Sequence, residues 1–342
     1  MKRIVLTSVI EGYADQFLAD LKALNNPPLN RLTELENQLL ARGLRFFADY
    51  VETIIRHYNN IVKAKPDDMS TRISGFFTGF IGLIDLSTDL RLEVTQDDGT
   101  VKHVTKKFYQ WVTDALGYDD VQEKVFPKYL RKMGMKSCVY CNAQYAVAAK
   151  KGTTDRSKAF RSTYTIDHYL PKSVYPYLAT SFFNLYPACP TCNQMKSRKD
   201  PLFKLYVNPQ DAAVSRNPFV FRLDRHSFVK YSMSGKAEDL VIKFDSRNGL
   251  PTGAVDATAY DDFFHVEKLY ANYCDTVEEL IWKYRMYNKA GRQALMDGFS
   301  YVLPHKSDWN RFVLGNYDQE KDIQKRPLAK LVQDVAKQLG II

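Results

Sequence analysis

The sequence lacks several features that would assign it to familiar protein classes. Its 342 residues contain no internal repeat and no low-complexity segment, which argues against a solenoid or a disordered chain. An apolar run over residues 75–86 is far shorter than the roughly 20 residues that a membrane-spanning helix needs. The first residues carry a short apolar stretch without a small-residue cleavage site, so we expect a cytoplasmic, soluble protein.

Cysteine is scarce, and its odd count of five does not suit a disulfide framework. Four of the cysteines form two pairs with two residues between the partners, Cys138 with Cys141 and Cys189 with Cys192. Two such thiolate pairs complete one tetrahedral zinc shell and leave no open position, so the sequence predicts a structural Zn²⁺ site. The alternative is four buried cysteines without a metal.

Positive charge is concentrated in one part of the chain. The formal net charge is +9, yet residues 128–206 alone carry 14 Lys and Arg against three acidic residues, whereas residues 1–127 and 207–342 are nearly neutral. A basic block of this kind is typical of a surface that faces a polyanion such as nucleic acid. A well-solvated surface is the alternative.

The flanking regions have different secondary-structure patterns. Apolar residues at helical spacing predict one helix over residues 32–63, with Thr33 and Glu36 as a capping box at its start. Asp98-Gly99 between two short apolar segments predicts a hairpin. Further helices are predicted over residues 106–116, 120–133 and 261–294 and from Pro327 to Gly340, and further strands over residues 219–223, 227–233 and 239–244.

Between the two cysteine pairs lies the segment with the most chemistry. It contains Asp167-His168 followed by Pro171, Lys172 and Ser173, then Asn184, and Asn193 directly after the last cysteine of the second pair. On a strand, neighbouring side chains point to opposite faces, so one member of the Asp-His pair can face a metal while the other faces a water molecule.

The complete pattern CxxC…DHxxPxS…N…CxxCNxxK, from Cys138 to Asp200, resembles the HNH nucleases of the ββα-metal (His-Me finger) superfamily. It resembles more narrowly the HNH subunits of bacterial anti-phage systems of the Septu or retron-associated type. The resemblance implies an α+β protein in which a zinc-stapled ββα-metal core (128–206) has two strands around residues 163–185 and a helix near Cys192. A mostly helical N-terminal region (1–127) and a C-terminal region with short strands and then helices (207–342) flank this core, which we expect to fold by itself around zinc.

The resemblance also implies roles for single residues. His168 is the general base, Asn184 braces the loop that carries it, and Asp167 and Asn193 are ligands of a catalytic metal. Because an asparagine oxygen favours hard cations, we expect Mg²⁺ or Mn²⁺ rather than Zn²⁺ at this position. Four basic residues are candidates for phosphate contacts, with a solvated helix face as the alternative for the last three: Lys172, Lys196, Arg198 and Lys199.

The function implied is metal-dependent hydrolysis of DNA phosphodiester bonds, in anti-phage defence. Two alternatives stay open: an HNH toxin that cleaves RNA or tRNA, and a zinc-stapled DNA-binding module without catalysis. The flanking regions are expected to gate the nuclease or to dock a partner, which the resemblance suggests is an ATPase. Since the sequence contains no GxxxxGK(S/T) motif, any ATPase must be another chain.

Overall fold

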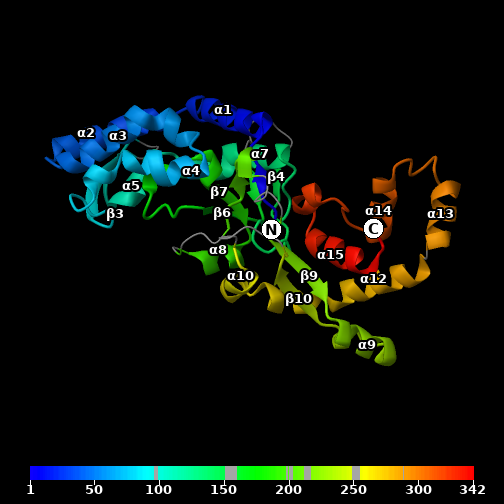
Figure 1. Cartoon of the computed structure of the whole chain (residues 1–342). Helices are drawn as coiled ribbons and strands as arrows, with labels where there is room; N and C mark the ends of the chain where they lie inside the picture. Colours follow the sequence, from blue (N-terminus) through cyan, green and yellow to red (C-terminus); the bar gives the residue numbers. More distant parts are fainter. Residues whose placement is uncertain are drawn as a thin grey trace.

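The computed structural model describes residues 1–95, 99–150, 160–197, 199, 203–211, 217–248, 255–287 and 289–342. It has the predicted α+β class, with long helices and five two-stranded sheets in the described part of the chain. Figure 1 shows the N-terminal helices at one end, strands β6 and β7 with helix α8 in the middle, and the C-terminal helices at the other end. Within the described residues, no helix combines the length and apolarity needed to cross a bilayer.

The N-terminal region begins with a strand, a group of helices and a hairpin. These are β1 (Ile4–Val5), α1 (Ser8–Lys22), α2 (Pro28–Ala41), α3 (Arg45–Val62), α4 (Pro66–Asp68), β2 (Asp89–Thr95) and β3 (Val101–Lys107). The hairpin prediction is confirmed, since β2 and β3 pair antiparallel. The single helix predicted over 32–63 is wrong, because Gly43 adopts a φ of +72° that ends α2 and lets α3 start in a new direction. Thr33 lies inside α2 and bonds Leu29 O at 3.0 Å, so the predicted capping box is also wrong.

Three short helices lead into the central segment: α5 (Phe108–Ala115), α6 (Tyr118–Asp120) and, after one π-helical turn, α7 (Phe126–Lys132). Two antiparallel sheets follow, formed by β4 (Ala148–Lys150) with β5 (Phe160–Ser162) and by β6 (Thr165–His168) with β7 (Leu185–Ala188). Helix α8 (Pro190–Lys196) comes directly after β7. The resemblance implied two strands around residues 163–185 and a helix near Cys192. Strand β6 and helix α8 agree with this, whereas β7 begins only at Leu185, the last residue of the expected range.

The C-terminal region contains β8 (Tyr206–Val207), β9 (Phe219–Leu223), α9 (Arg225–Ser234), β10 (Ile242–Ser246), α10 (Ala257–Phe264), α11 (Val266–Tyr270), α12 (Cys274–Met286), α13 (Lys289–Gly298), α14 (Lys306–Leu314) and α15 (Ala329–Leu339). The strand predicted over 227–233 is wrong: the Asp224 carboxylate accepts a bond from Ser227 N at 2.8 Å and caps a helix instead. The helix predicted over 261–294 is broken, first at His265, whose φ is +49°.

The three segments distinguished in the sequence share one hydrophobic core. Phe17 of α1 packs on Phe182 of the central segment, with ring centroids 5.2 Å apart. Strand β1 pairs in parallel with β8, across about 200 residues of sequence. Tyr260 of α10 reaches the central segment from the other side and donates to Tyr140 O at 2.8 Å. The packing therefore does not separate residues 128–206 from their flanks as the sequence led us to expect.

Candidate active site and metal centre

The four paired cysteines come together as the sequence predicted. Their sulfur atoms lie within 4.8 Å of one another, all four residues are buried, and the sulfur atoms of Cys141 and Cys189 are 4.0 Å apart. A tetrahedral shell with Zn–S bonds of about 2.3 Å separates its sulfur atoms by about 3.8 Å. The cluster therefore has the ligand type, number and spacing that a structural zinc ion requires.

The turn from Cys138 to Asn142, which carries the first cysteine pair, is held by C-terminal elements. Asn142 adopts a φ of +54°, and its side chain donates to Ile323 O at 2.9 Å and accepts from Lys330 N at 3.0 Å. Tyr270 of α11 donates to Cys141 O at 2.7 Å. C-terminal elements thus satisfy buried polar groups of this loop, which would be costly to leave unpaired.

Tyr140, between the two cysteines of this loop, connects the sulfur cluster to the Asp-His pair. Its hydroxyl is buried and donates to Asp167 Oδ2. Burial raises the pKa of Tyr140 well above its usual value, so the hydroxyl keeps the proton that it donates. The cysteine loop thereby sets the orientation of the Asp167 carboxylate.

The second oxygen of Asp167 is paired with Lys196 of α8. Lys196 Nζ lies 3.3 Å from Asp167 Oδ1 and 2.7 Å from His168 O, and the two side chains are only 2% and 5% exposed. Burial raises the pKa of Asp167 and lowers that of Lys196, and their mutual attraction opposes both shifts. Lys196 therefore differs from the sequence expectation, because its ammonium is turned inward onto a carboxylate instead of outward to a phosphate.

His168, the last residue of β6, is 5% exposed. Its Nε2 donates to Ala179 O at 3.0 Å, which leaves Nδ1 as the nitrogen with the free lone pair. Burial, reinforced by the positive charge of Lys172, lowers the pKa of His168 to about 3, so the imidazole is neutral at pH 7. The unprotonated Nδ1 of this neutral imidazole is therefore the atom of the ring that can accept a proton.

Asn184 clamps the loop that follows His168. Its Oδ1 accepts from Leu170 N at 2.7 Å, and its Nδ2 donates to Leu170 O at 3.1 Å and to Leu178 O at 3.0 Å. The side chain is fully buried, so these bonds use all of its polar atoms on backbone groups of one loop. The loop from His168 to Leu178 is consequently fixed relative to β7.

Asp167, His168 and Asn193 line a single cavity of about 510 Å³. Lys172 lines it as well, whereas Lys199 is exposed and lies outside it, with its ammonium 4.8 Å from the ring of Phe263. Arg198 falls outside the described residues. The cavity thus brings together both predicted metal ligands, the predicted base and one of the four predicted phosphate contacts.

Several residues of the candidate site carry no sequence signal. The N-terminal region contributes Tyr109, Tyr118 and Gln122 to the wall of this cavity. Tyr118 contacts His168, with ring centroids 5.1 Å apart. Tyr140 lies inside the cysteine motif but at a position where the motif accepts any residue. Long-range contacts of this kind have no local spacing that a sequence pattern would reveal.

The donors in the cavity suit a hard divalent cation. Asp167 offers carboxylate oxygens, and two hydrogen bonds do not exhaust its roughly four lone-pair positions. The half-buried Asn193 side chain has no hydrogen-bond partner within the described structure, so its amide oxygen is available. Two oxygen ligands fit Mg²⁺ or Mn²⁺, which usually keep several water molecules. The two residues therefore fit the expected ion.

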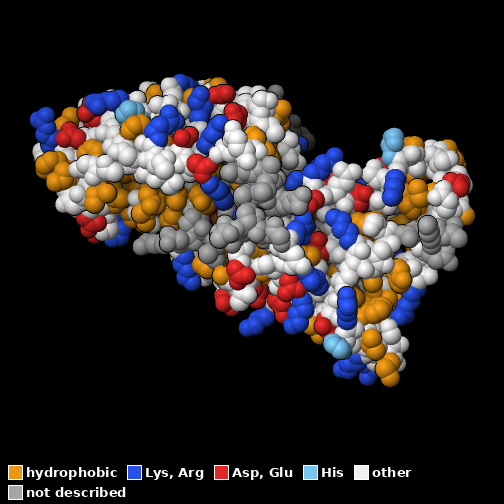
Figure 2. Space-filling view, viewed as in Figure 1, with side chains coloured by type: hydrophobic (Ala, Val, Ile, Leu, Met, Phe, Trp, Pro, Cys, Tyr) orange, Lys and Arg blue, Asp and Glu red, His pale blue; other side chains and the backbone are white. Residues whose placement is uncertain are grey.

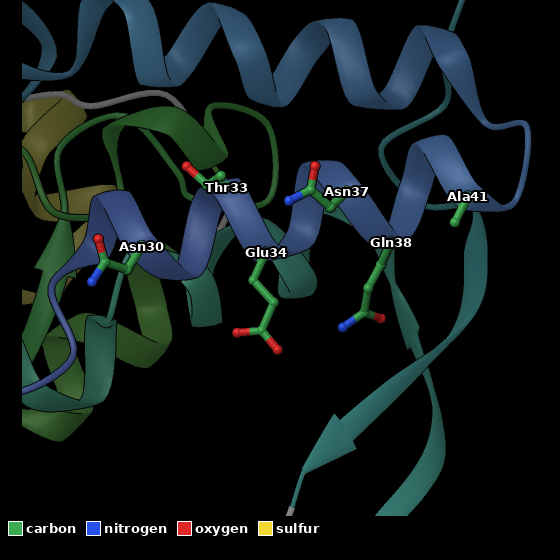
Figure 3. A pocket seen from close by; sticks show the side chains of 6 residues that line it. All are labelled: Asn30, Thr33, Glu34, Asn37, Gln38 and Ala41. Atoms are coloured by element: carbon green, nitrogen blue, oxygen red, sulfur yellow. The ribbon is translucent and has the colours of Figure 1, made fainter.

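A second hollow offers less chemistry. A shallow depression of about 600 Å³ lies along α2. Figure 3 shows the side chains of this helix that line it. Its lining comes from one helix: Asn30, Thr33, Glu34, Asn37, Gln38 and Ala41. Gln38 is already bonded to the backbone of Glu93, which ties α2 to the hairpin. This hollow shares no residue with the Asp167–His168 cavity, and its single carboxylate, Glu34, has no histidine or second acidic residue beside it in the lining.

Comparison with known proteins gives one partial likeness. The chain is 31% identical over 80 residues to the Septu protein PtuB of Bacillus thuringiensis. The match covers 23% of this chain and 26% of that protein, so the chain spans about a quarter of the length of the curated relative that it matches. No protein-family model matches the chain, and no solved structure matches it.

Proposed function

We propose that this chain is a metal-dependent HNH endonuclease that hydrolyses DNA phosphodiester bonds in bacterial anti-phage defence. The observation that carries the proposal is the single cavity in which Asp167, His168 and Asn193 meet. The resemblance of the motif to HNH nucleases supports the reaction, and the partial likeness to the Septu protein PtuB supports the role in defence. We further infer that Zn²⁺ occupies the four-cysteine cluster.

The residues named by the motif have separate roles in the proposed reaction. His168 takes a proton from the attacking water at Nδ1, because Nε2 is committed to Ala179 O. Asp167 and Asn193 would hold the divalent ion, which when bound stabilises negative charge on the phosphate and on the leaving 3′ oxygen. Lys172 faces the phosphate, and Asn184 keeps the His168 loop in place. The products would be 3′-hydroxyl and 5′-phosphate ends.

The experiment compares the wild-type chain with His168→Ala on plasmid DNA and on RNA, in Mg²⁺ and in EDTA. We expect Mg²⁺-dependent cleavage of DNA by the wild type and a loss of at least about 100-fold in His168→Ala, as removal of a general base produces. His305→Ala, an exposed histidine on the loop before α14, is the matched control and should cleave at the parental rate. Zinc content should be the same in all three proteins, and circular dichroism should show each of them folded at the assay temperature, although His168→Ala loses the buried bond to Ala179 O.

Each other outcome rejects part of the proposal. Cleavage of RNA alone would identify an RNA nuclease, and binding of DNA without any cleavage would identify a zinc-stapled binding module. Cleavage by His168→Ala at the parental rate, in a preparation free of contaminating nuclease, would refute the assignment of the base.

We also propose that the chain docks a partner subunit, for which an ATPase is our expectation. The support is a set of exposed apolar side chains at the C-terminal end of the molecule, where Figure 2 shows apolar surface over α9 and α12. Met233 is 86% exposed, Met286 66% and Trp282 48%. Exposed apolar groups in such numbers are typical of interaction surfaces. The test is co-purification of this chain with the ATPase subunit. We expect the wild type to retain the subunit and the Met233→Asp/Met286→Asp variant to lose it.

A further inference from the structure

One wall of the cavity comes from outside the HNH-like motif. Tyr109 of α5, Tyr118 of α6 and Gln122 all precede the first cysteine pair, and all three are half-buried at the cavity. A ββα unit with a zinc cluster does not need them for its own chemistry. Their position raises the question of what the N-terminal region contributes to the reaction.

Tyr118 makes three contacts that place it between the base and a cation. The Lys172 ammonium lies 3.8 Å from the centroid of its ring. The His168 ring lies 5.1 Å away at an interplanar angle of 42°, and the Tyr118 hydroxyl donates to Ile166 O at 3.3 Å. The ring is thereby fixed to β6, and one of its faces is covered by the lysine.

Lys172 is the only cation among the described residues that line the cavity. It makes no salt bridge within the described part of the chain, unlike Lys196, whose ammonium is bound to Asp167. A lysine side chain is flexible, and an ammonium without a carboxylate partner would ordinarily move among many rotamers. The ring of Tyr118 gives this one a defined position beside His168.

The turn that presents Tyr118 is itself anchored. Gly117 adopts a φ of +73°, which lets α6 begin sharply after α5. Asp120 at the end of α6 bonds Arg31 of α2 and also Lys124, the latter at 2.6 Å. The position of the Tyr118 ring is consequently set by the N-terminal helices.

We propose that Tyr118 is a positioning residue that holds the Lys172 ammonium toward the substrate phosphate, so that the N-terminal region completes the active site. This inference rests on the proposed function, because it assumes a phosphodiester in the cavity. The proposed function assigns no role to Tyr118, whereas this inference assigns it the contact between its ring and the Lys172 ammonium.

The test is a double-mutant cycle on kcat/KM for a labelled DNA duplex. We expect Lys172→Gln and Tyr118→Leu each to lower kcat/KM about tenfold, the effect of losing a well-placed cation contact. In the Lys172→Gln background, Tyr118→Leu should cost less than about twofold, since the two residues act through one contact. Tyr118→Phe, which keeps the ring, should retain at least about a third of the activity.

Two exposed residues provide matched controls: Tyr301→Leu and Lys22→Gln should leave kcat/KM unchanged. A second readout is the salt dependence of duplex binding in EDTA, where no cleavage occurs. The slope of the logarithm of the binding constant against the logarithm of the salt concentration reports the number of phosphate contacts. Lys172→Gln and Tyr118→Leu should each make this slope shallower by up to the equivalent of about one contact. A purely structural role of Tyr118 would leave the slope unchanged. If Tyr118→Leu melts well below the wild type, Tyr118→Met replaces it, because the flexible methionine fills similar space.

The outcomes separate the two proposals. Additive losses in the cycle, or Tyr118→Leu activity equal to that of the wild type, would overturn the role of Tyr118 while leaving the nuclease assignment intact. A wild-type chain that cleaves neither DNA nor RNA would overturn the nuclease assignment. In that case the duplex-binding measurement in EDTA still tests the role of Tyr118. An unchanged salt dependence in Tyr118→Leu would reject the positioning of Lys172, and a shallower salt dependence would support it.

Discussion

Replacing Lys196 by methionine tests the inward orientation of this side chain. Lys196 is buried, and its ammonium bonds both Asp167 Oδ1 and His168 O. In the Lys196→Met variant, the Tyr140 hydroxyl is the one side chain in the described part of the protein that still donates to the Asp167 carboxylate. The His168 carbonyl loses the bond from the lysine ammonium. Removing one partner of a buried ion pair typically costs about 3–5 kcal/mol, because the remaining charge is left uncompensated.

Methionine keeps most of the apolar stem of lysine, so loss of packing adds little to this figure. We therefore expect Lys196→Met to lower the free energy of unfolding by about 3–5 kcal/mol, measured by urea denaturation of the zinc-loaded protein at pH 7. The double variant Asp167→Asn/Lys196→Met should recover part of this loss, since it no longer buries an unpaired carboxylate.

Lys283→Met is the matched control, because Lys283 pairs with Glu279 at 3.7 Å on α12 and Glu279 is 61% exposed. An exposed pair of this kind contributes at most about 0.5 kcal/mol, so this variant should unfold nearly as the wild type does. A loss below about 1 kcal/mol in Lys196→Met, together with weaker DNA binding, would refute the buried pair. The lysine would then face a phosphate, as the sequence alone suggested.

Two other variants test the frame around the site. Cys189→Ser opens the four-thiolate shell and should abolish zinc binding, which in such sites is coupled to folding by on the order of 10 kcal/mol; elemental analysis and circular dichroism measure both effects. Gly117→Ala places a Cβ 3.0 Å from Arg31 Nη1 at a φ of +73°, and should destabilise the protein by about 1–2 kcal/mol in thermal melting. Gly235→Ala is the control, because Gly235 has a similar φ of +67° with open space around it. The difference in stability loss between the two variants therefore measures the cost of displacing the Arg31 side chain.

Local signals in the sequence predicted local structure well. Asp98-Gly99 marked the hairpin, Gly340 marked the end of the last helix, and the cysteine spacing predicted a four-sulfur cluster. These features depend on residues close in sequence or on a motif with few geometric solutions. The two helices predicted too long failed where periodic apolar residues continued across a break, at Gly43 and at His265, since both sides of each break face the same core. The strand predicted over 227–233 failed for another reason, because the Asp224 cap starts a helix there.

The sequence motif predicted which residues form the candidate site, but it did not predict which other side chains contact them. The motif named Asp167, His168 and Asn193, and the structure brings them to one cavity. It did not indicate that Lys196 would turn toward Asp167, because a helical spacing of three places side chains on one face without saying what lies opposite. Tyr118 was invisible to the motif, since its partner Lys172 lies 54 positions away and no pattern links them.

The same long-range contacts decide whether the zinc segment can fold alone. Residues 128–206 without their flanks lose the donors and acceptors that Tyr260, Tyr270 and the segment around Ile323 supply to the cysteine loop. Each buried polar group left unpaired costs about 1–3 kcal/mol, and a small domain has little stability in reserve. We therefore expect the fragment 128–206 to show no cooperative thermal transition in the presence of zinc, whereas the full chain does. A fragment that binds one zinc per chain and melts cooperatively would show that the core is autonomous, and that the flanking contacts merely attach two further regions to it.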